Sequence, residues 1–201
     1  MIAMSEAADG ATGDLKLLDR FLRDARLARA RLHVPQGALV LDVGCGDGEL
    51  FRRWKGHISG GVGIEPTLPE RVAGDGFELM PGRFPDDAPV GRQFDAMTML
   101  AVLEHLPPVV QAKLADACAA LLKPGGRVII TVPSPRVDDI LHVLLKLRLI
   151  QGISAHEHYG YRPSDTPAIF PPPRFRLIKR ATFQLGLNNL FVFERTEADS
   201  S

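Results

Sequence analysis

The chain is poor in cysteine and has no excess of charge of either sign. Its 201 residues contain only Cys45 and Cys118, too few for a disulfide framework and consistent with a reducing cytoplasm. Basic and acidic residues number 24 each, so the formal net charge is zero. Nucleic-acid binding draws on a basic surface for its phosphate contacts. The composition therefore predicts no nucleic-acid partner.

Long apolar runs and a targeting signal are also missing. The longest apolar region, residues 140–150, is interrupted by Lys146 and Arg148 and is too short to span a bilayer. The first residues lack the basic, apolar and small-residue order of a signal peptide. We therefore expect a cytoplasmic protein without stable membrane insertion. The length fits one domain over residues 1–201, with a frayed start at 1–13.

Strand patterns alternate with helices or turns along most of the chain, which predicts parallel strands joined by right-handed crossovers. A leading helix is expected over 14–32, begun by Asp14. It is interpreted either as a simple packed helix or as one folded over a ligand. Expected strands are 38–43, 61–65, 77–80, 94–100 and 127–132, followed by a hairpin of 175–184 and 189–195. Expected helices end at Trp54, span Pro108–Leu122, and form only a short, poor piece within 66–76.

The most informative segment is VLDVGCGDGEL, residues 40–50. Its apolar start fits a buried strand, and Gly44, Gly46 and Gly48 let the chain turn sharply and let a ligand approach the backbone. A second strand ends in Glu65, whose carboxylate can accept hydrogen bonds from both hydroxyls of a ribose. Together they indicate a cofactor that carries a nucleoside.

The spacing of the glycines distinguishes between such cofactors. A dinucleotide turn has glycine at its first, third and sixth positions, and here the sixth position is Glu49, an acid that opposes a diphosphate. Asp42, placed before the turn, suits a ligand with a cationic amine. S-adenosylmethionine has that amine together with a ribose and an adenine, so this pattern favours it over a nicotinamide dinucleotide.

On these residues the chain resembles the class I S-adenosylmethionine-dependent methyltransferases, of the group of small bacterial methyltransferase domains. Four segments follow the family's order: VLDVGCGDGEL, GVGIEP, FDAMTMLAVLEHL and LLKPGGRVIITVPSP. The resemblance implies an α/β fold, a Rossmann-like doubly wound seven-stranded sheet of order 3-2-1-4-5-7-6 with strand 7 antiparallel.

The resemblance also implies roles for residues around the ligand. Residues for the methionine portion are Asp42, Gly44, Cys45, Gly46 and Gly48, with Leu100 and Ala101 beside it. Glu65 and Pro66 would hold the ribose. Arg83 and Phe84 follow the third strand, where the family contacts adenine. Phe84 fits either stacking on the base or a place in the core, and Arg83 stands where the family usually has an acid.

Candidate catalytic residues come from two places. His105 is a candidate general base, or else it braces the following helix. His158 is a second candidate, and Tyr159 and Tyr161 are candidate substrate contacts, because the family closes over its acceptor in the region that corresponds to 136–174. No metal is expected. The apolar helix expected at 138–150 fits a wall of the acceptor pocket, the core or a homodimer interface.

These features predict methyl transfer from S-adenosylmethionine to a small molecule, at oxygen in preference to nitrogen or carbon. The chain lacks the Asn/Asp-Pro-Pro-aromatic tetrapeptide of enzymes that methylate amino groups of nucleic acids, and it lacks the Pro-Cys dipeptide of cytosine C5 enzymes. Two alternatives stay open. One is a binding domain that has lost turnover, and the other is aminopropyl transfer on the same fold.

Overall fold

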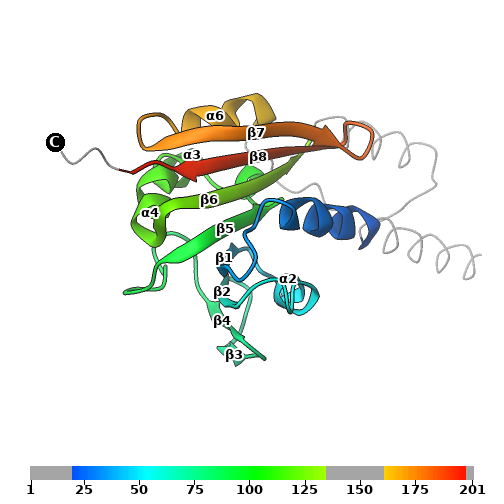
Figure 1. Cartoon of the computed structure of the whole chain (residues 1–201), viewed down its shortest axis with the longest axis vertical. Coiled ribbons are helices and arrows are strands. Elements are labelled where there is room, and N and C mark those ends of the chain that lie inside the picture. Colours follow the sequence, from blue (N-terminus) through cyan, green and yellow to red (C-terminus); the bar gives the residue numbers. More distant parts are fainter. Residues whose placement is uncertain (1–19, 135–160, 198–201) are drawn as a thin grey trace, which may run out of the picture.

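The computed structural model describes residues 20–134 and 161–197. Within them, eight strands form one sheet of order β3-β4-β2-β1-β5-β6-β8-β7 (Figure 1). The strands are β1 (Leu39–Val43), β2 (Gly60–Glu65), β3 (Val72–Ala73), β4 (Phe77–Pro81), β5 (Phe94–Leu100), β6 (Leu122–Pro133), β7 (Phe175–Phe183) and β8 (Asn188–Arg195).

The predicted order of the seven long strands is confirmed. Strands β4, β2, β1, β5 and β6 run parallel, and β8 pairs antiparallel with both β6 and β7. Strand β8, the seventh of the predicted strands, therefore is the antiparallel one. The two-residue strand β3 was not predicted and pairs antiparallel with β4 at the edge of the sheet.

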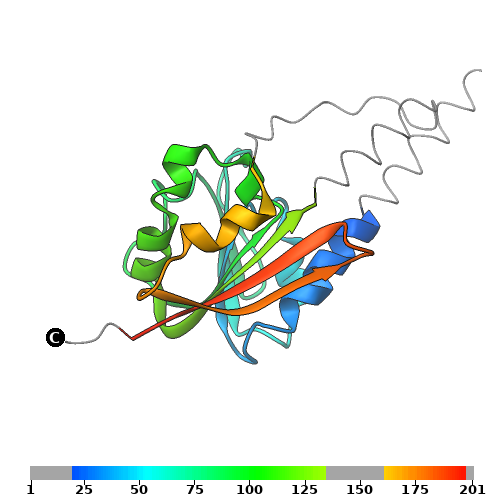
Figure 2. The ribbon, with the colours of Figure 1, turned by 90° about the horizontal axis from the view of Figure 1, so that it is seen from above.

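Helices cover both faces of the sheet (Figure 2). The leading helix (residues 20–31) and α2 (Glu49–Arg53) lie on one face, and α3 (Pro108–Gln111), α4 (Leu114–Leu121) and α6 (Thr166–Ile169) lie on the other. Short 3-10 turns, η1 (Leu103–His105) and η2 (Pro163–Asp165), follow β5 and precede α6.

Each face of the sheet has its own apolar core. Under the leading helix and α2, the core includes Leu27, Phe51 and Trp54, which are all nearly inaccessible. Helix α2 lies very close to β2, because a Cβ on Gly61 would come within 2.3 Å of the Phe51 ring. On the other face, Leu114 of α4 and Phe170 beside α6 pack on the sheet. Burial on both faces explains why the central strands are almost wholly apolar.

Four predicted elements differ from the structure. The strand expected over 127–132 is longer, because β6 begins at Leu122, where its first residue pairs with Phe94 of β5. Residues 66–76 contain no helix, because their prolines and glycines form turns and strand β3. The helix expected over Pro108–Leu122 is divided into α3 and α4. The turn of the final hairpin lies one residue earlier than predicted, at 184–187, because β7 ends at Phe183 and β8 begins at Asn188. The predicted cap Asp14 and the segment 1–13 lie outside the described residues.

Candidate functional site

The turn between β1 and α2 is held in a form that glycine favours. Gly44, Gly46 and Gly48 have φ of +73°, +52° and +79°, which residues with a Cβ rarely adopt. The Gly44 amide donates to the Ile64 carbonyl at 2.9 Å, which ties the turn to the end of β2. A Cβ on Gly44 would lie 2.4 Å from Cγ2 of Val102, so glycine is required there on two grounds.

Beside this turn is a cavity of about 280 Å³. It lies at the carboxyl ends of β1 and β5, the point where the order of the strands reverses. Its walls are Arg23, Arg26, Leu27, Asp42, Gly44, Cys45, Gly46, Asp47, Glu49, Leu50 and Leu100. A Cβ on Gly46 would meet no atom within 4 Å, so the backbone there is open to a ligand. The predicted methionine-end residues Asp42 and Leu100 are thus brought together with the turn.

Asp42 is the most deeply buried acid of the cavity wall. It is 5% exposed, and its Oδ1 accepts a hydrogen bond of 2.6 Å from the Thr98 hydroxyl on β5. Burial raises the pKa of Asp42 to about 7; the Thr98 hydrogen bond lowers it, and the nearby Glu65 carboxylate raises it. A carboxylate of this kind favours a cationic ligand group, because such a group restores the ionised form.

Glu65 ends β2 beside the glycine turn. Its Oε2 accepts a hydrogen bond of 3.3 Å from the Gly46 amide, and its Oε1 accepts from the Thr67 amide at 3.0 Å and the Thr67 hydroxyl at 2.7 Å. These contacts hold the carboxylate over the turn. The predicted neighbour Pro66 is exposed and begins the turn that contains Thr67.

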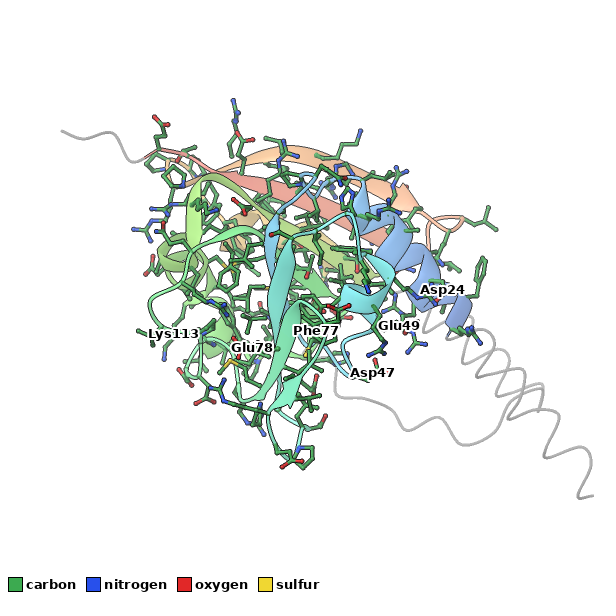
Figure 3. All side chains as sticks on the ribbon, turned by 60° about the horizontal axis from the view of Figure 1, so that its bottom comes forward. Asp24, Asp47, Glu49, Phe77, Glu78 and Lys113 are labelled. Atoms are coloured by element: carbon green, nitrogen blue, oxygen red, sulfur yellow. The ribbon has the colours of Figure 1, made fainter. Side chains whose placement is uncertain are left out.

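The leading helix lines one side of the cavity and also packs in the core through Leu27, so both of its interpretations remain predictions. Arg23 and Arg26 line the cavity, and Arg23 Nε lies 2.8 Å from Oε2 of Glu49 on α2. A second ion pair joins Arg53 of α2 to Asp24 at 2.7 Å. Figure 3 shows Asp24 and Glu49 on these adjoining elements, with Asp47 in the turn below them.

The two residues predicted near the adenine, Arg83 and Phe84, lie in the loop after β4. Phe84 is 6% exposed and belongs to the core beside α4, so the structure favours its core interpretation over stacking on a base. Arg83 uses its amide to donate to Oδ2 of Asp87 at 2.8 Å, within the loop. Neither residue is part of the cavity wall.

Cys45 is buried beneath the turn. Burial raises the pKa of its thiol to about 12, so the thiol is neutral. Its Sγ would lie 2.5 Å from a Cβ on Gly63 of β2. Cys45 is therefore a packing residue that also contributes to the cavity wall.

The segment after β5 contains a residue in the left-handed backbone region, Ala101, and a buried acid, Glu104. Ala101 has φ +58°, and its amide donates to the Thr131 carbonyl at 2.9 Å. Glu104 is only 3% exposed, and its Oε2 has no hydrogen-bond partner within the described part of the chain. Burial raises the pKa of Glu104 to about 7. His105, the candidate base, has a side chain 42% exposed whose Nε2 lies 3.9 Å from Oε1 of Glu104.

Of the second cluster, only Tyr161 is described; His158 and Tyr159 lie outside the described residues. The Tyr161 hydroxyl is 2.6 Å from Oγ1 of Thr166, and burial raises the pKa of the phenol to about 12. Tyr161 lies near enough to Glu104 for that carboxylate to raise the phenol's pKa further. Residues 20–134 and 161–197 contain no group of three or more potential metal ligands. Their helices are also too short or too polar to cross a bilayer.

Sequence reasoning missed several residues at this site. Arg23 and Arg26 are three positions apart on the leading helix, a spacing that puts both on one face. Thr98 is a hydroxyl within the buried stretch AMTML of β5, and Glu104 is an acid within the mainly apolar stretch LAVLEHL. Each was visible as a polar residue in an apolar context. The partners of Arg23 and Thr98, however, are Glu49 and Asp42, which come from distant parts of the chain.

The chain is also similar to known proteins. Residues 16–166 match the family model described as a methyltransferase domain. The chain is 31% identical over 142 residues to the ubiquinone biosynthesis O-methyltransferase of Vibrio vulnificus, covering 64% of this chain and 60% of that protein. It is 36% identical over 121 residues to the enzyme of the same name from Xylella fastidiosa, covering 55% and 48%. The chain thus spans about half to three fifths of the length of these curated relatives.

Solved structures share the fold. The 1,6-didemethyltoxoflavin-N1-methyltransferase of Burkholderia thailandensis, solved with S-adenosylhomocysteine, has a TM-score of 0.65 at 17% identity and covers 97% of this chain and 89% of its own. The N-methyltransferase NodS of Bradyrhizobium japonicum, also solved with S-adenosylhomocysteine, has a TM-score of 0.60 at 15% identity, covering 87% and 86%.

Proposed function

Since the chain belongs to the family of S-adenosylmethionine-dependent methyltransferase domains, we propose that this protein transfers a methyl group from S-adenosylmethionine to a small-molecule acceptor, at an oxygen atom. The observation that carries the proposal is the cavity at the carboxyl ends of β1 and β5. Its wall combines a buried acid, an open glycine turn and two arginines. Glu65 lies beside the same turn, within a hydrogen bond of Gly46.

The charges of the cavity fit the amino-acid end of the cofactor. Asp42 would accept the α-ammonium group, and Arg23 and Arg26 would meet the carboxylate, since a guanidinium suits carboxylate geometry. A decarboxylated cofactor, as used in aminopropyl transfer, would leave the arginines without that contact. The arginines therefore support methyl transfer over the aminopropyl alternative.

The nucleoside end would extend past Gly46 toward Glu65. The Glu65 carboxylate already accepts hydrogen bonds from Gly46 and Thr67, and it would accept the ribose hydroxyls with its remaining lone pairs. Pro66 would stiffen this position. Because Phe84 is in the core, the adenine would have to find its contacts at other residues of this edge.

When bound, the cofactor supplies a methyl carbon that its sulfonium already activates. The chain needs to bind and orient the two reactants, exclude water and, for an oxygen acceptor, take up one proton. Leu100 and Ala101, at the end of β5, would flank the methionine portion. His105 follows them with a half-exposed ring and is the proposed proton acceptor.

Two observations support the proposed acceptor. The relatives' name, ubiquinone biosynthesis O-methyltransferase, supports oxygen as the acceptor atom. The apolar sequence of residues 138–150 supports a lipid-like or aromatic acceptor. His158, Tyr159 and Tyr161 are proposed as contacts of the acceptor.

The protein is also proposed to be cytoplasmic and to form a homodimer. Sedimentation of the purified protein tests the dimer.

Calorimetric titration with S-adenosylmethionine, S-adenosylhomocysteine and NAD tests the cofactor. We expect both sulfur ligands to bind and NAD to give no heat. Phenolic and other hydroxyl acceptors are then screened for release of S-adenosylhomocysteine. Binding without turnover on any acceptor would favour a binding domain, and the absence of sulfur-ligand binding would overturn the proposal.

A further inference from the structure

Thr98 and Asp42 face one another across the two central strands. They are register partners in the parallel pair of β1 and β5. Thr98 is fully buried and Asp42 is 5% exposed, so neither side chain can rely on water. The Thr98 Oγ1 lies 2.6 Å from Oδ1 of Asp42.

The hydroxyl has a clear preference between two acceptors. Besides Asp42 Oδ1, the Leu41 carbonyl lies 3.5 Å from Oγ1, a distance at which a hydroxyl hydrogen bond is weak. A carboxylate is also the stronger acceptor. The Thr98 proton therefore points at Asp42, so the sheet holds one carboxylate oxygen of a residue that lines the cavity.

Thr98 is the partner that favours the ionised form of Asp42 against its surroundings. Burial and the carboxylate of Glu65 on β2 both raise the pKa of Asp42, and the Thr98 hydrogen bond lowers it. Asp47 and Glu49, from the turn and α2, add negative charge to the cavity wall, while Arg23 and Arg26 of the leading helix add positive charge. The Cys45 thiol nearby is neutral, since its pKa is about 12.

We propose that Thr98 is a positioning residue for the cofactor: its hydroxyl holds the Asp42 carboxylate ionised and correctly oriented to bind the cofactor's α-ammonium group. The inference rests on the proposed function, because it assumes that the cavity takes the amino-acid end of S-adenosylmethionine. Thr98 would not contact the cofactor itself, but it would control the ionisation of the Asp42 carboxylate, which does.

Thr131 provides a matched control. It is also fully buried in the sheet, on β6, and its Oγ1 has no hydrogen-bond partner within the described residues. Thr98→Val and Thr131→Val thus make the same chemical change in the same sheet. Only the first removes a donor from Asp42.

The affinity for S-adenosylhomocysteine is measured by calorimetry between roughly pH 6 and pH 8.5. We expect Thr98→Val to weaken binding about tenfold near pH 7. Much of the loss should recover toward the upper end of the range, where Asp42 ionises without help. Thr98→Ser should restore binding, and Thr131→Val should bind as the natural protein does.

A truncated ligand separates positioning from a general structural effect. 5′-Methylthioadenosine has the nucleoside and sulfur but no amino-acid end, so Thr98→Val should bind it as tightly as the natural protein does. Equal loss for both ligands, or an unchanged pH profile with S-adenosylhomocysteine, would overturn the inference and leave the cofactor proposal standing. Failure of the natural protein to bind S-adenosylhomocysteine would overturn the proposed function itself. If Thr98→Val does not fold, Thr98→Ala makes the same test without adding volume.

Discussion

The Gly46 amide donates a hydrogen bond of 3.3 Å to Oε2 of Glu65, which joins the glycine turn to the end of the neighbouring strand. The two halves of the proposed cofactor site are therefore joined by a direct hydrogen bond. The amino-acid end would lie on the Gly46 side and the ribose on the Glu65 side. Pre-organisation of this kind lowers the cost of ordering the site when a ligand binds.

Glu65→Ala should weaken binding of S-adenosylhomocysteine by roughly 1–3 kcal/mol, the loss expected for charge-assisted hydrogen bonds to the ribose. Calorimetry measures the change directly. Glu78→Ala is the control. Glu78 is a partly buried acid on β4 that pairs with Arg92 at 2.6 Å, and it is not part of the cavity wall. Equal affinity of the Glu65 variant and the natural protein would remove Glu65 from the ribose role.

Substitutions of Gly44 and Gly46 by alanine should differ in their effect on stability, because only the first introduces a steric clash. Gly44→Ala forces a Cβ against Val102 and should lower both thermal stability and cofactor affinity, whereas Val102→Ala in the same chain should recover part of the stability. Gly46→Ala meets open space, so it should cost only about 1–2 kcal/mol of stability for its left-handed backbone. Its affinity for the cofactor should nevertheless fall, because the ligand would occupy that space.

Melting curves and calorimetry on the two glycine variants and the double variant test this difference. The outcome that contradicts it is Gly46→Ala binding S-adenosylhomocysteine normally. Normal binding would mean that the cofactor does not approach the turn.

Glu104 should make the protein less stable as the pH rises. Its pKa is raised to about 7 from an ordinary 4.5, so the native protein holds a proton that the unfolded chain has released between those values. Stability from this group is therefore complete below about pH 4.5 and is lost as the pH rises toward 7. Asp42 has the same sign and adds to the trend.

Glu104→Gln should raise the free energy of unfolding by roughly 2–3 kcal/mol near pH 8 and change it little near pH 4. Denaturant titration at the two pH values measures both. Glu70→Gln, at an exposed position, is the control and should have no effect at either pH. A Glu104 variant that gains nothing near pH 8 would show that the carboxyl finds a partner in solution.

His105→Ala should reduce the rate of methyl transfer about 10²-fold while leaving cofactor affinity intact, as expected for loss of a general base. His33→Ala is the control, because His33 follows the far end of the leading helix and is not part of the cavity wall. Turnover and calorimetry on the same preparations separate catalysis from binding. A full rate in the His105 variant would leave the ring as a brace for the helix that follows.

Local patterns predicted the strands well, because burial on both faces leaves a clear apolar signature. Strand Phe94–Leu100 was predicted with its bounds as observed, and the order of the long strands followed from the family resemblance. The breaks inside helices were not predictable in this way. Helix α3 ends near Gln111, whose Nε2 donates to the Leu106 carbonyl at 2.8 Å and ties the helix to the preceding turn. Helical periodicity contains no information about such a contact.

Only part of the candidate site could be predicted, namely the residues that belong to recognisable local segments. Asp42, Gly44 and Leu100 belong to segments that the resemblance covers, and the structure brings them to one cavity. Arg23 and Thr98 act through partners 26 and 56 positions away in the chain, namely Glu49 and Asp42. Phe84 could not be assigned because an aromatic ring fits a base and a core equally well, and only packing decided between them.

The two described ends around residues 135–160 lie at the same edge of the sheet as the glycine turn. β6 ends at Pro133 beside β5, and the chain is described again from Tyr161, whose phenol is near Glu104. The strands, the glycine turn and the cavity wall described above all belong to residues 20–134 and 161–197. If residues 135–160 contact the acceptor, as proposed, exchange of that segment would change the acceptor preference and leave the proposed methyl-donor site unchanged. Chimeras that graft this stretch between related enzymes would then be a route to new acceptors on one scaffold.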